Sequence, residues 1–308
     1  SRFLGGAANV PVSVGRTMDL EKHKAMAERG IAATKAIDAP GFDVYDGWVQ
    51  FKGWDANPKA APRSSQVYTS DFTQLYGAFQ DNAKDNGRHP MLRVGGGPAG
   101  MNQFLAGAAF KSISEPTPLA QRFPGAGSDP ASLQGLILAK DAADMVLMDE
   151  LMSQQDRYGN IESQAFKVFE EGGQLKKVRL DRKDESEDKA ESPIDRPDVP
   201  GTIVHELLLR DNDCGVAKTN VNATANGGKG IVTSLAHMSA HTYKHFQWMA
   251  AEIGRAGSPV QRAFAEESFW NATDLANVTK QAQALAATLK SPCQGGALPR
   301  AAALRAPR

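Results

Sequence analysis

Apolar residues recur at spacings of three, four and seven along much of the chain, and this pattern predicts a mainly α-helical protein. The pattern is strongest near the C-terminus. There, residues 231–254 and 260–289 predict two helices separated by Gly-Ser-Pro at residues 257–259. A third long helix is predicted to start at Ser132, whose hydroxyl can cap its first turn, and to reach Leu151.

Shorter helical segments are predicted in the N-terminal half. Thr17 or Asp19 can cap a helix that runs to about residue 38, where Ala-Pro-Gly follows. Aromatic and aliphatic residues at helical spacing predict a short helix over about residues 71–84. Residues 161–171 are predicted to be helical as far as Gly172-Gly173.

One segment changes to the period of a β-strand. Residues 42–45 and 48–51 are β-prone and flank Asp46-Gly47, a dipeptide that suits the positive φ angles of a tight hairpin turn. Residues 202–210 fit either a short strand or a helix. Prolines predict loops over residues 53–69 and 116–130. The expected fold class is therefore mainly α with a small β-hairpin and long irregular segments.

The distribution of charge predicts a domain boundary. Residues 176–198 contain seven basic and eight acidic side chains. This leaves too few apolar groups to offset the entropy lost when the chain becomes ordered. We expect a solvated linker there, or alternatively a docking segment that orders on a partner. The predicted parts are an N-terminal helix, hairpin and extended segment (1–69), a helical domain (70–175), the charged linker (176–200) and a C-terminal helical domain with an irregular tail (201–308).

Composition excludes some classes of protein. Of the 308 residues, 35 are Lys or Arg and 35 are Asp or Glu, so no cationic excess favours nucleic-acid binding. No apolar run is long enough to predict a transmembrane span. The two cysteines, Cys214 and Cys293, are too few for a zinc cluster or a disulfide scaffold.

The first residues have the composition of an organellar transit peptide. Ser, Arg, small and apolar residues precede the first acid, Asp19. This composition predicts that a leader is cleaved nearby and that the protein works in an organelle, a mitochondrion rather than a plastid. A trimmed terminus, or the proteolytic maturation of a capsid-type protein, would explain the same residues.

Three histidines form the first candidate site. At about 100° per residue, His237, His241 and His245 fall on one stripe of the helix predicted over residues 231–254. Neutral imidazoles one turn apart are good ligands for Zn²⁺ and similar metal ions. The stripe therefore predicts a metal or haem site, or alternatively a helix face packed against another subunit or a second helix.

A glycine-rich segment forms the second candidate site. Residues 93–101, with Gly95, Gly97 and Gly100, read Arg-Val-Gly-Gly-Gly-Pro-Ala-Gly-Met and resemble the phosphate-binding turn of flavoproteins. The resemblance covers about nine residues and implies a pyrophosphate held at a helix N-terminus, hence a flavin- or dinucleotide-binding oxidoreductase. The alternative is a Gly-rich loop that leads into an ordinary helix.

Four acids interrupt the apolar pattern of the helix predicted from Ser132: Asp141, Asp144, Asp149 and Glu150. Paired carboxylates can act in general acid–base catalysis. Acids on an amphipathic helix otherwise occupy its solvent-exposed face, which is where we expect these four.

These patterns together favour a non-catalytic structural or accessory subunit of a large multi-subunit assembly, of the respiratory or photosynthetic type. Its partners would be other protein subunits, and it could lie peripherally on a membrane complex. Trp48, Phe51 and Trp54 would be suitable anchors in a partner's pockets. The alternatives are a helical enzyme with a metal ion or haem at the histidine stripe, and a flavin or dinucleotide oxidoreductase at Gly95–Gly100.

Overall fold

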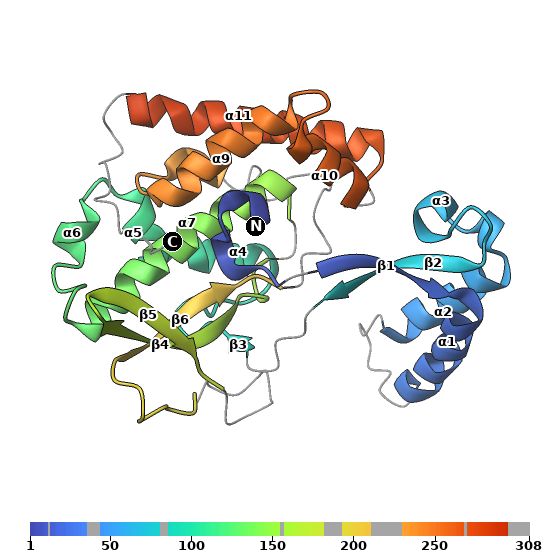
Figure 1. Cartoon of the computed structure of the whole chain (residues 1–308), viewed down its shortest axis with the longest axis horizontal. Helices are drawn as coiled ribbons and strands as arrows, with labels where there is room; N and C mark the ends of the chain where they lie inside the picture. The colour runs from blue at the N-terminus through green and yellow to red at the C-terminus, as the bar shows by residue number, and fades with distance from the viewer. Residues whose placement is uncertain are drawn as a thin grey trace. The chain divides into compact units, whose positions relative to one another are not determined.

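The computed structural model of the chain describes residues 1–11, 13–35, 44–80, 86–154, 157–181, 193–210, 230–267 and 270–294. The chain divides into two compact units (Figure 1). The larger unit contains Ser1–Pro11, Asn82–Phe264 and Ala272–Arg308, and the smaller contains Val12–Asp81 and Ala265–Asn271. Helices with small antiparallel sheets make up the described residues, which confirms the mainly α class.

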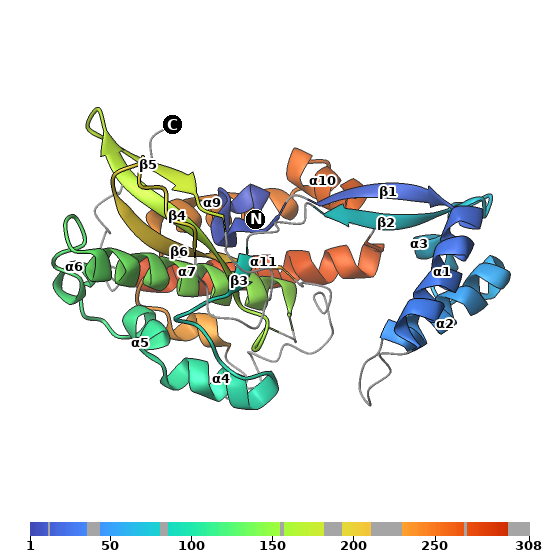
Figure 2. The same ribbon diagram turned by 90° about the horizontal axis from the view of Figure 1, so that it is seen from below.

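Helix α7 (Pro130–Met152) runs through the larger unit. Asp129 caps it by accepting from the Ser132 backbone N–H at 2.8 Å, and Pro130 occupies the first turn, where no backbone donor is needed. The predicted cap at Ser132 is therefore wrong, because the helix begins two residues earlier, at Pro130. Strand β6 lies against α7, and helices α5 and α11 also contact it (Figure 2). Most residues from Leu138 to Leu151 are buried, so neighbouring segments surround this part of the helix on most sides.

The other helices of the larger unit pack around α7 or continue from its neighbours. Short 3₁₀ turns at η1 (Arg2–Leu4), η2 (Ala7–Asn9) and η4 (Ile231–Ser234) bring further segments onto this core. The remaining helices are α4 (Gly97–Ala106), α5 (Ala108–Ser114), α6 (Leu119–Arg122), α9 (Ala240–Ile253), α10 (Pro259–Glu267) and α11 (Ala272–Gln294).

A four-stranded antiparallel sheet completes the larger unit, with β4 (Glu162–Glu171) at its centre. Strand β6 (Thr202–Leu208) pairs with one edge of β4, while β3 (Asn86–Arg88) and β5 (Gln174–Arg179) pair with the other. Gly172 and Gly173 form the β4–β5 turn, with φ angles of 63° and 74°. The helix predicted over residues 161–171 is therefore wrong, because Gly-Gly closes a hairpin here. The strand alternative for residues 202–210 is confirmed.

The smaller unit combines a two-stranded sheet with a pair of helices. Strands β1 (Ser13–Asp19) and β2 (Gln74–Gln80) are antiparallel, with Ser13 opposite Gln80. Asp19 caps α1 (Leu20–Thr34) by accepting from the Lys22 N–H at 2.9 Å, which confirms the second of the two predicted caps. The other elements are α2 (Val44–Ala56), η3 (Pro58–Ala60) and α3 (Ser64–Val67), and the buried core is Leu20, Ala61, Tyr68 and Leu75.

Two predictions in this unit are wrong. The hairpin expected around Asp46-Gly47 is helix α2, because the helical conformation turns Trp48 and Phe51 towards His23 on α1. The helix expected over residues 71–84 is strand β2, whose backbone pairs with β1 more than fifty residues earlier in the chain. In both cases packing against α1 or β1 overrides a local preference.

The irregular segments differ in part from expectation. The predicted loop 116–130 contains α6, and the predicted loop 53–69 contains η3, α3 and the end of α2. Lys176–Arg179, at the start of the predicted linker, belong to β5, whereas residues 182–192 lie outside the described residues. Residues 211–229 and the predicted C-terminal tail also lie outside them. Among the described helices, none has the length and apolarity to cross a membrane.

The contact between α1 and α2 generates the first prediction. A Cβ added at Gly30 would lie 2.5 Å from the indole ring of Trp48, whereas a Cβ at Gly53 would meet nothing within 4 Å. We expect Gly30→Ala to destabilise the smaller unit by about 1–3 kcal/mol through overpacking. Gly53→Ala should instead stabilise it by about 0.5–1 kcal/mol, because alanine favours helix. Amide hydrogen exchange of α1 and α2 in the full chain measures both, and equal stabilisation by the two variants would contradict the packing.

Candidate functional site

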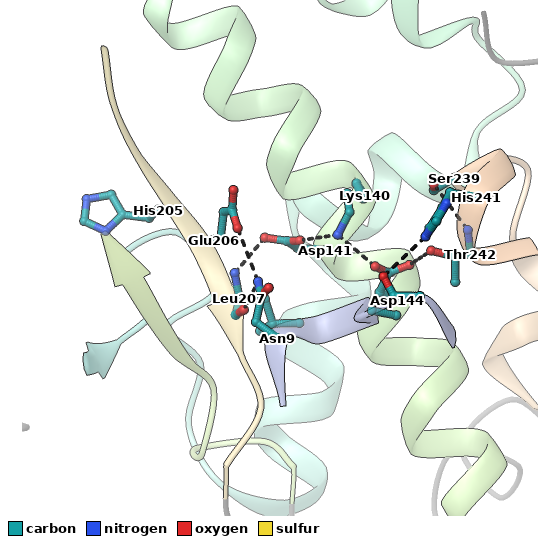
Figure 3. A network of polar contacts seen from close by, with 12 residues as sticks. Asn9, Lys140, Asp141, Asp144, His205, Glu206, Leu207, Ser239, His241 and Thr242 are labelled. Atoms are coloured by element: carbon teal, nitrogen blue, oxygen red, sulfur yellow. Dashed lines mark hydrogen bonds and ion pairs between the residues drawn. The ribbon is translucent and has the colours of Figure 1, made fainter. Parts of the chain in front are cut away.

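Side chains from α7 and η2 complete the outer edge of strand β6. The amide of Gln134 exchanges two hydrogen bonds with the backbone of His205, accepting at 2.7 Å and donating at 2.9 Å. Asp141 Oδ2 accepts from the Leu207 N–H at 2.7 Å, and Asn9 Nδ2 donates to the Leu207 carbonyl at 2.9 Å (Figure 3). An edge strand otherwise leaves these backbone groups unpaired. The polar side chains therefore continue the sheet without a further strand.

Lys140 joins this edge to helix α9. Its Nζ lies 3.1 Å from Asp141 Oδ1 and 2.9 Å from Asp144 Oδ2 (Figure 3). The hydroxyl of Thr242, in the first turn of α9, donates to Asp144 Oδ1 at 2.8 Å. Asp141, Asp144 and Thr242 are all buried, while Lys140 keeps about half of its side chain in solvent. One lysine thus forms an ion pair with each of two buried carboxylates.

Burial and charge act against each other in this cluster. Burial raises the pKa of Asp141 to about 6, although the Lys140 ammonium and the Leu207 N–H favour its ionised form. Burial lowers the pKa of Lys140, but the nearby carboxylates of Asp144 and Asp141 outweigh it and hold that pKa above the usual lysine value. Lys140 is therefore a permanent cation, which suits charge neutralisation and not general-base catalysis.

The C-terminal half of α7 fixes two more segments. Arg157 Nε donates to both oxygens of Asp149 at 3.0 Å, and Arg157 Nη1 donates to the Arg210 carbonyl at 3.2 Å. Glu150 Oε2 accepts from the Val232 N–H at 2.9 Å, at the start of η4. Burial raises the pKa of Glu150, while this backbone hydrogen bond lowers it. Both carboxylates are buried and act as internal anchors.

The expectation that the four acids of α7 are exposed is wrong. Each is at most 4% exposed and binds a cation, a hydroxyl or a backbone N–H of another segment. The sequence carried a signal for this. Relative to Asp141, at about 100° per residue, the other three acids lie at about 300°, 80° and 180° around the helix, which is no single face.

The structure brings two of the three predicted histidines together. Helix α9 begins at Ala240, so His237 precedes it, and the ring of His237 lies 2.9 Å from the Glu115 carbonyl through Nε2. The His241 and His245 rings are 4.4 Å apart, and His241 Nε2 lies 3.3 Å from the Gly5 carbonyl. Within the described part of the chain, no three His, Cys, Asp or Glu side chains form a group that could hold a metal ion.

The predicted glycine-rich site lies at the N-terminus of α4. Residues 91–96 before the helix form no strand, and the paired strands of both described sheets are antiparallel, unlike a dinucleotide-binding unit. A Cβ at Gly100 would fall 1.6 Å from the Gly95 carbonyl oxygen, and Gly97 has a φ of 60°. The Gly95 N–H donates to Gln103 Oε1 at 3.0 Å. The positive φ of Gly97 and the close approach of Gly100 to Gly95 thus account for glycine at these two positions.

A separate polar cluster lies in the smaller unit, and no sequence motif predicted it. Asp55 accepts from the Tyr68 hydroxyl at 2.7 Å, and its other oxygen lies 2.6 Å from His23 Nδ1. Burial, together with the hydrogen bond to Asp55, raises the pKa of Tyr68, so the phenol remains a donor. All three side chains are buried, and the rings of Phe51 and Trp48 pack beside His23. The cluster joins α1, α2 and the end of α3.

Comparison with protein-family models, with curated proteins and with solved structures finds no match for this chain. The chemistry of the described side chains therefore carries the functional argument alone.

The first prediction from α7 concerns pH. A pKa of about 6 for Asp141, against 3.8 for an aspartate in water, means that the folded protein binds this proton more tightly than the unfolded chain does. Its stabilising contribution is complete below the unfolded pKa and is lost as the pH rises through 6. Relative to Asp141→Asn, the free energy of unfolding of the wild type should fall by about 3 kcal/mol between roughly pH 4 and pH 7.

Urea denaturation across this pH range measures the difference, and the carboxyl groups that do not interact with Asp141 cancel between the two proteins. If the free energy of unfolding of the wild type, relative to Asp141→Asn, rises with pH instead, the Lys140 ammonium and not burial determines the pKa of Asp141.

The second prediction tests the bond between α7 and α9. Thr242→Val removes the hydroxyl but keeps the shape, and leaves a buried oxygen of Asp144 without its donor. We expect a loss of about 1–3 kcal/mol in the free energy of unfolding. Thr242→Ser keeps the hydroxyl and serves as the matched control. Equal stabilities for the Val and Ser variants in denaturant titrations would show that the hydrogen bond contributes nothing.

Proposed function

We propose that the protein is a non-catalytic structural or accessory subunit of a large multi-subunit protein assembly. The observation that carries this proposal is the use made of the buried ionisable groups. In the larger unit, the four acids of α7 together with Lys140 and Arg157 bind one another, a hydroxyl or the backbone of neighbouring segments. Buried ionisable groups that form such contacts hold strands and helices in place, which is a structural role.

Exposed apolar side chains give the proposal its second support. Several large ones are spread along the chain, in both units, each between 44% and 56% exposed. Apolar groups on several surfaces suit a protein that contacts more than one neighbour, although single ones also occur on monomers. They are Val44, Val49, Met91, Leu175, Ile194 and Trp248.

We expect Trp48, Phe51 and Trp54 to contribute less to partner binding than the exposed side chains, because they pack within the smaller unit. Phe51 and Trp54 lie edge to face at 5.1 Å, and Trp48 packs over Gly30. These rings are half-buried within the smaller unit. An organellar location, in a mitochondrion and in a complex of the respiratory type, remains part of the proposal and rests on the composition of residues 1–18.

Native size tests the proposal. The chain, extracted gently from the cells that make it, should migrate in a stable particle several times larger than its own 33.0 kDa. Chemical cross-linking followed by mass spectrometry should connect it to the same neighbours in independent preparations. Denaturing detergent should release it to the monomer position, as a control. Recovery only at the monomer mass before denaturation would contradict the proposal.

A further inference from the structure

One buried histidine of the larger unit has an incomplete set of hydrogen bonds. His89 directly follows β3 and is fully buried, and its backbone N–H donates to the Ile161 carbonyl at 2.8 Å. Its ring Nδ1 accepts from the Met91 N–H at 3.2 Å, so the hydrogen of the neutral ring is on Nε2. That Nε2 is buried and has no hydrogen-bond partner in the described part of the chain. This arrangement requires the neutral form of the ring.

Protonation of the ring conflicts with this arrangement. The second proton has to go to Nδ1 of His89, where it meets the Met91 N–H, and two donors then face each other. A buried imidazolium without a paired carboxylate also costs free energy. Burial, and after it the nearby His205, lower the pKa of His89 to about 3. The hydrogen-bond geometry and the pKa therefore agree that the folded protein disfavours the charged ring.

The charged neighbours of His89 that the structure describes supply no counter-ion. The group on β6 that acts on it is another histidine, His205, which can only add positive charge. On β3, Arg88 is an exposed cation. Opposite it on β4, the carboxylate of Glu162 pairs with Arg210 at 3.2 Å. Among the described residues, no carboxylate raises the pKa of His89, so acid places an uncompensated charge there.

We propose that His89 makes the contact between β3 and β4 acid-sensitive, so that protonation of its ring releases β3 and residues 89–91 from the edge of β4. The contact is small enough to open locally, because three described residues of β3 form the pairing: Asn86, Gly87 and Arg88. Release frees the backbone groups of β4 at residues 162–164, an edge to which another strand can add. This acid response is independent of the proposed subunit function.

The core around α7 should remain folded at the same pH. Burial raises the pKa of Asp141 and that of Asp149 to about 6, so the stability that these two carboxyl groups contribute increases as the pH falls from 7 to 4. The contribution of His89 has the opposite sign. It is complete above 6.5, the ordinary histidine pKa, and is lost as the pH falls towards 3. Acid therefore favours local opening at β3 over global unfolding.

Amide hydrogen exchange of the full chain at several pH values tests the proposal. Protection factors remove the intrinsic effect of pH on exchange. We expect protection of residues 87–91 to fall about tenfold per pH unit between roughly pH 5.5 and pH 4, while protection of α7 does not fall. His89→Asn keeps an acceptor for the Met91 N–H but does not titrate, so protection of this segment should be independent of pH. The matched control is His237→Asn, at another buried histidine, which should respond to pH like the wild type.

Three results would overturn the proposal: pH-independent protection of residues 87–91 in the wild type, the same fall in His89→Asn as in the wild type, or a parallel fall in the protection of α7. The first and third results need no variant, so the wild type alone decides the matter if His89→Asn does not fold. His89→Gln supplies a second side chain that does not titrate.

Discussion

The larger unit depends on the hydrogen bonds that α7 makes with the outer edge of β6. A strand with one unpaired edge is a liability, because its free backbone groups invite another strand to add. Gln134 and Asp141, two turns apart on α7, bind the backbone of His205 and Leu207, which are two positions apart on β6. Because alternate residues of a strand present their backbone groups to the same edge, this spacing lets one helix cover it.

This arrangement requires charge inside the core. A buried carboxylate loses solvation, and the cost is offset only when partners satisfy its oxygens. Lys140 provides such a partner. Its ammonium reaches both Asp141 and Asp144, while about half of its side chain remains exposed to solvent. The cation thus avoids full desolvation while the acids do not. Breaking one contact leaves a buried charge unpaired, which couples β6, α7 and α9 energetically.

Local chemistry predicted some elements and long-range pairing decided others. The cap at Asp19 followed from a side chain next to the helix end, whereas the cap of α7 is Asp129 and not the predicted Ser132. Strands β1 and β2 pair across more than fifty residues, a relation that helical spacing within residues 71–84 could not reveal. The hairpin that begins with residues 161–171 could have been predicted, because Gly172-Gly173 after them is a hairpin signal in the sequence itself. For the candidate site, the sequence showed that the four acids are dispersed around α7. It did not show that Asp55 contacts His23 and Tyr68.

Helix α9 connects the interior network to the surface. Its buried Thr242 is held by Asp144, while Trp248 and Lys244 on its outer side face solvent. Because Asp144 holds the first turn of α9 from within, these outer side chains stand on an element that is anchored to the core. The buried polar groups of α7 and α9 thus hold the helix, while the indole of Trp248 and the ammonium of Lys244 lie on its solvent-exposed side.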